Sequence, residues 1–305
     1  MAARLGLLAL GLALGYGLAR VSAKRRPRKG RRVALVDNGS LKPEATKSLR
    51  RLAAALAAKA GLKVEAVSAK FADRIAAEKL DGQPGEVLAG WLQRVKKEDP
   101  DAQVQLLPLL IGPSDTLTKA MPEAAQAADV EVEIAPSLVC LCPVLYGHQE
   151  ERGAHGLAQM LRERLEDAQL SANDVVLLCD HGSPAARVAA AKDAVRAELA
   201  ALLGRPVTGC CMERREGAEY DFNGPLLEKA LQALPPNTSA KVALLFLQEG
   251  RHAGPGGDID QILGQVKQKR PDLSLATTRV LAGHEGLVEL LAKRLRKTVP
   301  ARLFH

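Results

Sequence analysis

Residues 175–183 of the chain read VVLLCDHGS, a short apolar run that ends in a polar turn. An amphipathic pattern follows over residues 188–203, where Val195, Leu199 and Leu202 share one face. An apolar run of this length that is bounded by a turn is typical of a buried strand leading into a helix. The stretch therefore predicts a strand, a turn and a helix, with the turn at the carboxyl end of the strand.

The same unit occurs earlier in the chain at an offset of 143 residues. Residues 33–40 read VALVDNGS, and an amphipathic stretch follows at residues 48–59. Apolar runs alternate with helical patterns along the remaining chain, which is typical of βαβ units and a parallel sheet. This alternation predicts strands at residues 33–36, 64–67, 104–111, 130–135, 175–179, 207–211, 242–247 and 273–281.

The repeat predicts an α/β protein of two similar lobes, each a four-stranded parallel sheet flanked by helices. At roughly 150 residues per domain, the length of 305 residues also suggests two units. We expect a leader at residues 1–32, an N-terminal lobe at 33–150, a connecting helical region at 151–172 and a C-terminal lobe at 173–305. A cleft is expected between the two lobes.

Composition excludes several classes of protein. The net charge of +8 resides in residues 1–32, which hold nine Lys and Arg residues and no acid, so the remaining chain is about neutral and has no nucleic-acid footprint. The few aromatic residues, 4 Phe, 3 Tyr and 1 Trp, also argue against a platform for stacking bases. The odd number of cysteines, 5, indicates a reducing compartment rather than a disulfide framework.

The leader is a targeting segment by its pattern. Residues 5–19 are an uninterrupted apolar run, and basic residues follow from Arg20 to Arg32. The run is shorter than the roughly 20 residues that a spanning helix needs, although flanking residues extend it. Two interpretations stay open: a plastid-targeting peptide, or a membrane anchor that leaves the body of the protein on the cytoplasmic side.

Comparison of the two halves reveals candidate functional residues. The second half carries His181, Glu213 and His252 at the positions where the first half carries, in the same order, Asn38, Ala69 and Ser114. Each position follows the carboxyl end of a predicted strand, the edge at which open parallel sheets bind ligands. In a sheet of strand order 2-1-3-4, the three side chains converge. Two imidazoles and a carboxylate are suited to holding a divalent metal briefly and to accepting protons.

With these residues, the chain resembles the sirohydrochlorin chelatases of the CbiX type, within the class II tetrapyrrole metal chelatases. The resemblance spans residues 33–297 and is carried by three segments. These are LLCDHGS at residues 177–183, LFLQEGRH at 245–252 with its continuation AGPGGDI at 253–259, and Met212-Glu213.

The resemblance implies a lyase-type enzyme of siroheme or cobalamin biosynthesis that inserts Fe²⁺ or Co²⁺ into sirohydrochlorin or a related tetrapyrrole without ATP. It implies that His181 and His252 bind the metal, that His181 and Glu213 take up pyrrole protons, and that no cofactor is permanently bound. Arg214, Arg215 and Arg251 adjoin these positions and are expected to bind substrate carboxylates. Because the first half lacks the histidines, one active site is expected. A monomer is expected because the duplication already supplies both lobes of the cleft.

Three other kinds of protein are alternatives to a chelatase. The main alternative is a non-catalytic homologue that binds a tetrapyrrole or a metal but does not turn over. A serine hydrolase is disfavoured because no G-x-S-x-G segment is present, and a phosphatase because Arg251-His252 lacks the following glycine. We expect Asp258 to cap a helix. We expect core packing for Cys140 and Cys142, on one face of a strand, and for Cys210 and Cys211, inside the predicted strand at 207–211. No chemistry is assigned to His148, His155 or His284.

Overall fold

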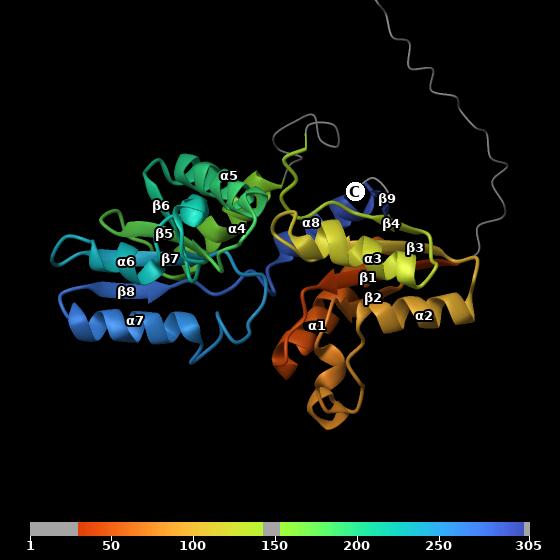
Figure 1. Ribbon diagram of the computed structural model, residues 1–305. Helices are drawn as coiled ribbons and strands as arrows, with labels where there is room; N and C mark the ends of the chain where they lie inside the picture. The colour runs from red at the N-terminus through yellow and green to blue at the C-terminus, as the bar shows by residue number, and fades with distance from the viewer. Residues whose placement is uncertain (1–29, 143–152, 302–305) are drawn as a thin grey trace, which may run out of the picture.

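The protein consists of two α/β lobes that lie side by side (Figure 1). The computed structural model describes residues 30–142 and 153–301. The predicted leader and His148 lie outside these residues, apart from the last residues of the leader. Within the described ranges, no helix has the length and apolar character needed to cross a membrane.

The N-terminal lobe is built on a sheet whose strand order is β2-β1-β3-β4-β9. The first four strands are parallel, as predicted, and β9 pairs with β4 in the antiparallel sense. The strands are β1 (Arg31–Asp37), β2 (Val64–Ser68), β3 (Gln103–Pro108), β4 (Val132–Ile134) and β9 (Val299–Pro300).

The C-terminal lobe repeats this order as β6-β5-β7-β8, with all strands parallel. Its strands are β5 (Val175–Asp180), β6 (Val207–Cys211), β7 (Ser239–Leu244) and β8 (Ser274–Thr277). The predicted α/β class and the order 2-1-3-4 are therefore confirmed in both halves.

Helices cover both faces of the two sheets. The α-helices are α1 (Pro43–Ala60), α2 (Leu88–Glu98), α3 (Met121–Ala127), α4 (Ala154–Asp167), α5 (Ala186–Leu203), α6 (Leu227–Gln232), α7 (Asp258–Lys269) and α8 (Glu285–Leu295). Shorter helical segments are η1 (Ala72–Arg74), η2 (Ala77–Leu80), η3 (Thr116–Ala120) and η5 (Ala218–Asn223). The amphipathic stretches at 48–59 and 188–203 lie within α1 and α5, as predicted.

Each half of the chain places its closing helix on the other half. Helix α4, which follows the first four strands, packs against α5 and β7, whereas α8 packs against α1 and β3 (Figure 1). One buried apolar cluster accordingly combines residues of α1, α4, α5 and α8, among them Leu52, Leu161, Val195 and Leu291. Since burial of apolar surface is the main favourable term in folding, this shared core joins the lobes.

Three details differ from the sequence predictions. The N-terminal sheet has a fifth strand, β9, because the chain returns to this lobe after α8. The predicted strands 104–111, 242–247 and 273–281 end earlier as regular strands, since apolar residues beyond each strand stay buried without continuing the ladder. Cys140 and Cys142 do not lie on a strand, and Cys142 is exposed rather than packed in the core.

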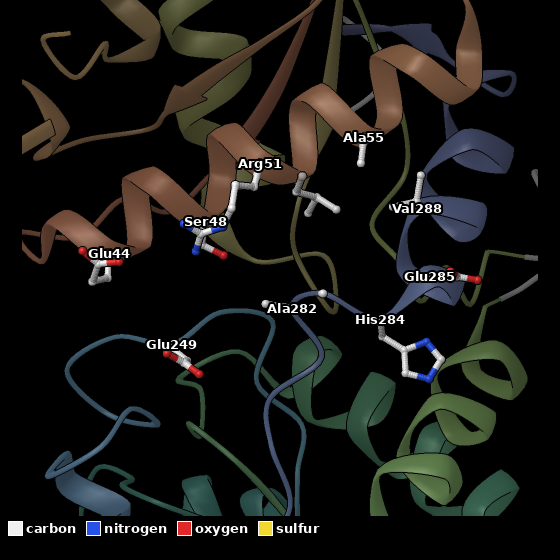
Figure 2. A pocket seen from close by; sticks show the side chains of 11 residues that line it. Glu44, Ser48, Arg51, Ala55, Glu249, Ala282, His284, Glu285 and Val288 are labelled. Carbon is white, nitrogen blue, oxygen red and sulfur yellow. The ribbon is translucent and has the colours of Figure 1, made fainter. Parts of the chain in front are cut away.

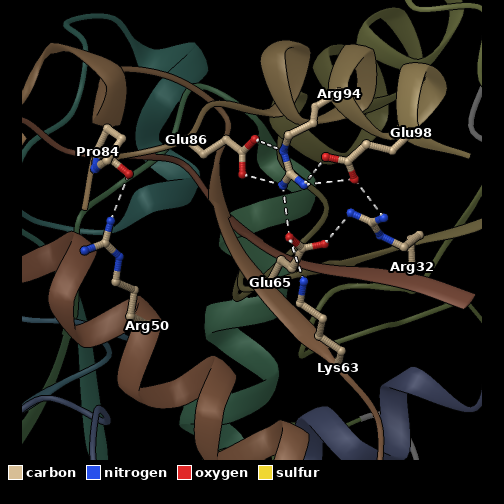
Figure 3. A network of polar contacts seen from close by, with 8 residues as sticks. All are labelled: Arg32, Arg50, Lys63, Glu65, Pro84, Glu86, Arg94 and Glu98. Atoms are coloured by element: carbon tan, nitrogen blue, oxygen red, sulfur yellow. Dashed lines mark hydrogen bonds and ion pairs between the residues drawn. The ribbon is translucent and has the colours of Figure 1, made fainter. Parts of the chain in front are cut away.

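A network of ion pairs joins β1, β2 and α2 at the outer side of the N-terminal lobe (Figure 3). Arg94 contacts Glu86 at 2.8 Å and Glu65 at 2.9 Å, and Arg32 contacts Glu65 at 3.1 Å and Glu98 at 3.0 Å. Exposed ion pairs contribute about 0–1 kcal/mol each. Because every charge in the network has a partner, it serves to hold these elements together and offers no free charge to a ligand.

The exchange of α8 is anchored by a buried arginine. Arg294 is only 1% exposed, and its guanidinium donates to the carbonyl oxygens of Ser137 at 3.0 Å and Leu138 at 2.7 Å. These carbonyls belong to the segment that follows β4. The side chain thus ties the last helix of the chain to the N-terminal lobe.

Replacement of Arg294 by Met should lower the free energy of unfolding by about 3 kcal/mol, because buried carbonyls lose their donor. Urea unfolding followed by circular dichroism measures the change. Lys293→Met, on the exposed side of the same helix, is the control and should change stability by less than about 0.5 kcal/mol. Equal stability of the two variants would contradict the anchoring role.

Candidate functional site

A glycine turn at the end of β5 brings two strands of the C-terminal sheet into contact at their carboxyl ends. Gly182 has a φ of +91°, and a Cβ atom placed there would lie 1.9 Å from the carbonyl oxygen of Glu213. Only glycine tolerates both the left-handed backbone and this approach. The Glu213 backbone N–H donates to the carbonyl of His181 at 3.0 Å, which extends the β5–β6 pairing to the two candidate residues.

His181 and Glu213 are direct neighbours. The Nε2 atom of His181 lies 3.3 Å from Oε1 of Glu213, and its Nδ1 atom lies 3.1 Å from the carbonyl oxygen of Gly182. A carbonyl only accepts, so Nδ1 carries a proton and Nε2 faces the carboxylate. A nitrogen lone pair and a carboxylate oxygen at this distance favour a proton or a metal cation between them.

His252 completes the group from the loop between β7 and α7. Its ring centroid is 4.7 Å from that of His181, with the ring planes at 81°. The Nδ1 atom of His252 is 2.6 Å from Oδ2 of Asp258, so the carboxylate holds the ring and leaves Nε2 with the lone pair. The structure therefore brings together His181, Glu213 and His252, the three residues predicted from the sequence.

The prediction that Asp258 caps α7 is wrong. The N-cap residue of this helix is Gly257. Asp258 is the first residue of the helix, and its carboxylate binds His252 instead. A carboxylate in the first turn of a helix is stabilised by the positive end of the helix dipole, which suits it to orient an imidazole. The acidic residue six positions after His252 was the available signal.

The three side chains form an open donor set. The exposed fractions of the side chains are 45% for His181, 62% for Glu213 and 32% for His252, so solvent and ligands reach all of them. In the part of the chain that the structure describes, no group of three or more His, Cys, Asp and Glu side chains is arranged to hold a metal ion. Such an arrangement suits transient contact with a cation better than permanent retention, which needs a closed set of ligands.

The thiols behind the site do not serve as ligands. Burial raises the pKa of Cys211 to about 11, and a hydrogen bond with Cys210 together with burial raises the pKa of Cys179 well above its ordinary value. Because the thiolate is the form that binds metals, these cysteines stay protonated and apolar at neutral pH. Core packing is confirmed for Cys140, Cys210 and Cys211, and Cys179 is buried as well.

The three candidate arginines differ in their surroundings. Arg251 is 74% exposed and lies 3.7 Å from Oδ2 of Asp258, close to the histidine pair. Arg214 is engaged within its own loop by Asp221 at 2.7 Å, and Arg215 stacks over Tyr220. Arg251, which is largely exposed and held only by this long ion pair, is thus the arginine best placed to meet a ligand beside the site.

The first half retains the turn without the chemistry. Asn38 accepts a hydrogen bond from Thr116 at 2.7 Å, and Gly39 has a φ of +85° like Gly182. Burial raises the pKa of Asp37, the residue before Asn38, to about 6. With its amide nitrogen turned to this carboxylate, Gln248 of the C-terminal lobe donates to Asp37 Oδ2 at 3.0 Å. This position therefore serves contact between the lobes.

A cavity of about 430 Å³ lies between the lobes. Figure 2 shows Glu44, Ser48 and Arg51 of α1 on one side, His284 near the start of α8, and Glu249 of the loop after β7. His284 Nδ1 accepts from the Gly286 backbone and its Nε2 contacts Glu163 at 3.0 Å, so it caps α8. Glu249 is the point at which the cavity meets the loop that bears the second histidine.

Removal of the Asp258 carboxylate should release the His252 ring. Asp258→Ala is expected to weaken Co²⁺ binding by about 10- to 100-fold, as is usual when the hydrogen-bond partner of a ligating histidine is lost. Titration of Co²⁺, followed by visible absorbance, measures the affinity. Asp260→Ala is the matched control, since Asp260 lies in the same helical turn but accepts from Gly256. Equal affinities of the two variants would refute the orienting role of Asp258.

Asp37 should make stability depend on pH. Its pKa is 3.8 ordinarily and about 6 in the folded protein, so the folded state retains a proton that the unfolded chain releases in this window. The free energy of unfolding therefore falls as pH rises from about 4 to about 6. Asp37→Asn should remove this fall and stabilise the protein at pH 7 by on the order of 2 kcal/mol.

Urea unfolding at about pH 4 and pH 7 tests this dependence. Asp73→Asn, at an exposed position of the same lobe, is the control. A pH profile of stability that is the same in Asp37→Asn and the parent would overturn the assignment.

Comparison with known proteins finds a family match in the second half of the chain. The CbiX family model matches residues 175–298, from the first residue of β5 to just before β9. The matched segment contains His181, Glu213 and His252. A comparison with curated protein sequences gives no match.

Solved chelatase structures share the fold over most of the chain. SirB from Bacillus subtilis with Fe³⁺ superposes with a TM-score of 0.60 at 14% identity, covering 88% of this chain and 95% of that one. The sirohydrochlorin chelatase SirB from Bacillus subtilis subspecies spizizenii, in complex with cobalt, gives 0.55 at 16% identity, covering 88% and 94%. CbiX, described as the terminal enzyme of siroheme biosynthesis in denitrifying bacteria, gives 0.57 at 14%, covering 87% and 98%.

Proposed function

Because the CbiX family model matches residues 175–298, we propose that the chain is a tetrapyrrole metal chelatase, which inserts Fe²⁺ or Co²⁺ into sirohydrochlorin without ATP. The observation that carries the proposal is the contact among His181, Glu213 and His252 at the carboxyl edge of the C-terminal sheet. The first half offers no equivalent group, so one site per chain is proposed.

The reaction requires bases close to the metal. A macrocycle binds a divalent metal as a dianion, so two pyrrole N–H protons must leave as the metal enters. Glu213 and Nε2 of His181 face one another at 3.3 Å and accept these protons in the proposed mechanism. Glu213, as the more exposed of the two, passes a proton on to solvent.

The metal is delivered by the histidines. His252 presents Nε2 because Asp258 holds its other nitrogen, and the ring of His181 lies against it. Imidazole and carboxylate ligands accept several divalent metals, including both Fe²⁺ and Co²⁺. An open set of ligands supports release of the metal to the macrocycle, which is what distinguishes a metal that is substrate from one that is structural.

Arg251 is proposed to bind a carboxylate at the edge of the tetrapyrrole. Its guanidinium is exposed and lies beside the loop that carries His252. Arginine recognises carboxylates with two parallel hydrogen bonds, which fixes the orientation of a substrate. Arg214 and Arg215 would need to leave their partners to do the same.

His181→Ala should lower the rate of Co²⁺ insertion into sirohydrochlorin by about 100-fold or more, since it removes a base and a ligand together. The absorbance change on metallation measures the rate. Asn38→Ala, at the equivalent position of the first half, is the matched control and should retain the parent rate within about twofold.

Two outcomes would contradict the proposal. Equal losses in His181→Ala and Asn38→Ala would remove the asymmetry between the halves. Tight binding of sirohydrochlorin or Co²⁺ by the parent protein, with insertion no faster than the spontaneous reaction, would favour the alternative of a non-catalytic binding protein. A panel of Fe²⁺ and Co²⁺ in the same assay decides the preferred metal.

A further inference from the structure

The C-terminal lobe contains a buried lysine behind the proposed site. Lys192 lies in the middle of α5 and is 1% exposed. Its Nζ atom is 2.5 Å from the carbonyl oxygen of Asn223, 3.4 Å from that of Cys210 and 3.4 Å from Oδ1 of Asp180. Burial of an ammonium group is costly unless the group is paired and hydrogen-bonded. The presence of this lysine with its three partners therefore calls for a structural reason.

The partners of Lys192 lie on both sides of His181. Asp180 immediately precedes His181, and burial raises the pKa of this carboxyl against the opposing effect of the Lys192 charge. Asn223 is fully buried, and its side chain accepts from the backbone N–H of Ser183 and donates to the Ser183 carbonyl, both at 2.9 Å. Lys192 is therefore connected to the residues before and after the Gly182 turn.

The same contacts fix the loop that follows Glu213. Asn223 ends η5 and also donates to the carbonyl of Tyr220 at 3.1 Å. At the other end of this loop, the Glu213 backbone is bound to the His181 carbonyl. The loop and the turn are thus held to each other at two points, and Lys192 lies under the second.

The first half supplies a natural comparison. Helices α1 and α5 both span 18 residues and end at a glycine in the left-handed conformation. At the offset of 143 residues, Lys192 corresponds to Leu49, which is buried in the apolar core. The turn after Asp37 nevertheless has the same left-handed glycine. The lysine is therefore not needed to form the turn.

From these contacts we propose that Lys192 is a positioning residue, which sets His181 against Glu213 and His252 through Asn223 and Asp180. The rival explanation is that Lys192 only neutralises the buried Asp180 carboxylate. The two explanations differ in one respect. A counter-charge becomes unnecessary when Asp180 is made neutral, whereas a positioning contact to Asn223 does not.

The deciding variant combines Lys192→Leu with Asp180→Asn. Leucine is chosen because Leu49 occupies the corresponding position of α1. We expect it to unfold in urea near the parent midpoint, because no buried charge is left unpaired. The two-dimensional NMR spectrum of the full chain labelled at histidine should nevertheless lose the nuclear Overhauser effect between the rings of His181 and His252, whose centroids are 4.7 Å apart in the structure.

Asn223→Ala removes the side chain that links Lys192 to the Gly182 turn without changing any charge. It tests the positioning role if the variant that combines Lys192→Leu with Asp180→Asn does not fold. It should also lose the contact between the rings. Arg196→Leu, one turn further along α5 and partly exposed, is the control and should keep it. Retention of the ring contact at parental strength in both the paired variant and Asn223→Ala would overturn the proposal.

The effect on catalysis rests on the proposed function, and the insertion assay measures it separately. The paired variant should insert Co²⁺ about 10-fold more slowly than the parent, mainly through kcat, because substrate contacts such as Arg251 are unchanged. A parent protein that shows the ring contact but inserts no metal would refute the proposed function, and the NMR result alone would then decide the role of Lys192.

Discussion

The close approach of the Gly182 turn to the backbone of Glu213 is the constraint on which the rest of the site depends. A side chain at position 182 would meet the Glu213 carbonyl at 1.9 Å, and the two strands could not extend their pairing to the candidate residues. Parallel strands present their carboxyl ends at one edge, so His252 arrives at the same place from β7. The chemistry at this edge therefore follows from the strand order and from one glycine.

The two lobes are joined by a shared apolar core. Helices α4 and α8 each follow the strands of one half and pack on the other half. Arg294 binds α8 to the N-terminal lobe through hydrogen bonds to two carbonyl oxygens. The exchanged helix α8 also lines the cavity between the lobes, together with α1 and the loop that bears Glu249.

The fold and the three candidate residues could be predicted from the sequence because both depend on local patterns. Short apolar runs mark buried strands, and His181, Glu213 and His252 each follow such a run, so their convergence needs only the strand order. The exchange of α4 and α8, strand β9 and the contact of Asp258 with His252 depend on how distant segments pack. The exchange of the helices and strand β9 leave no pattern along the chain, and the one signal for the Asp258 contact, an acidic residue six positions after His252, equally fits a helix cap.

The two halves separate the requirements of the fold from those of the chemistry. Both keep an aspartate and a left-handed glycine at the turn, so these residues belong to the architecture. Only the second half adds the imidazole at the turn, His181, and the lysine in the covering helix, Lys192, which are 11 residues apart and are connected through Asn223. A buried lysine is a poor choice for stability, where leucine serves in the first half. Its presence beneath the histidine, and its absence beneath Asn38, is what a demand for exact placement of one side chain would produce.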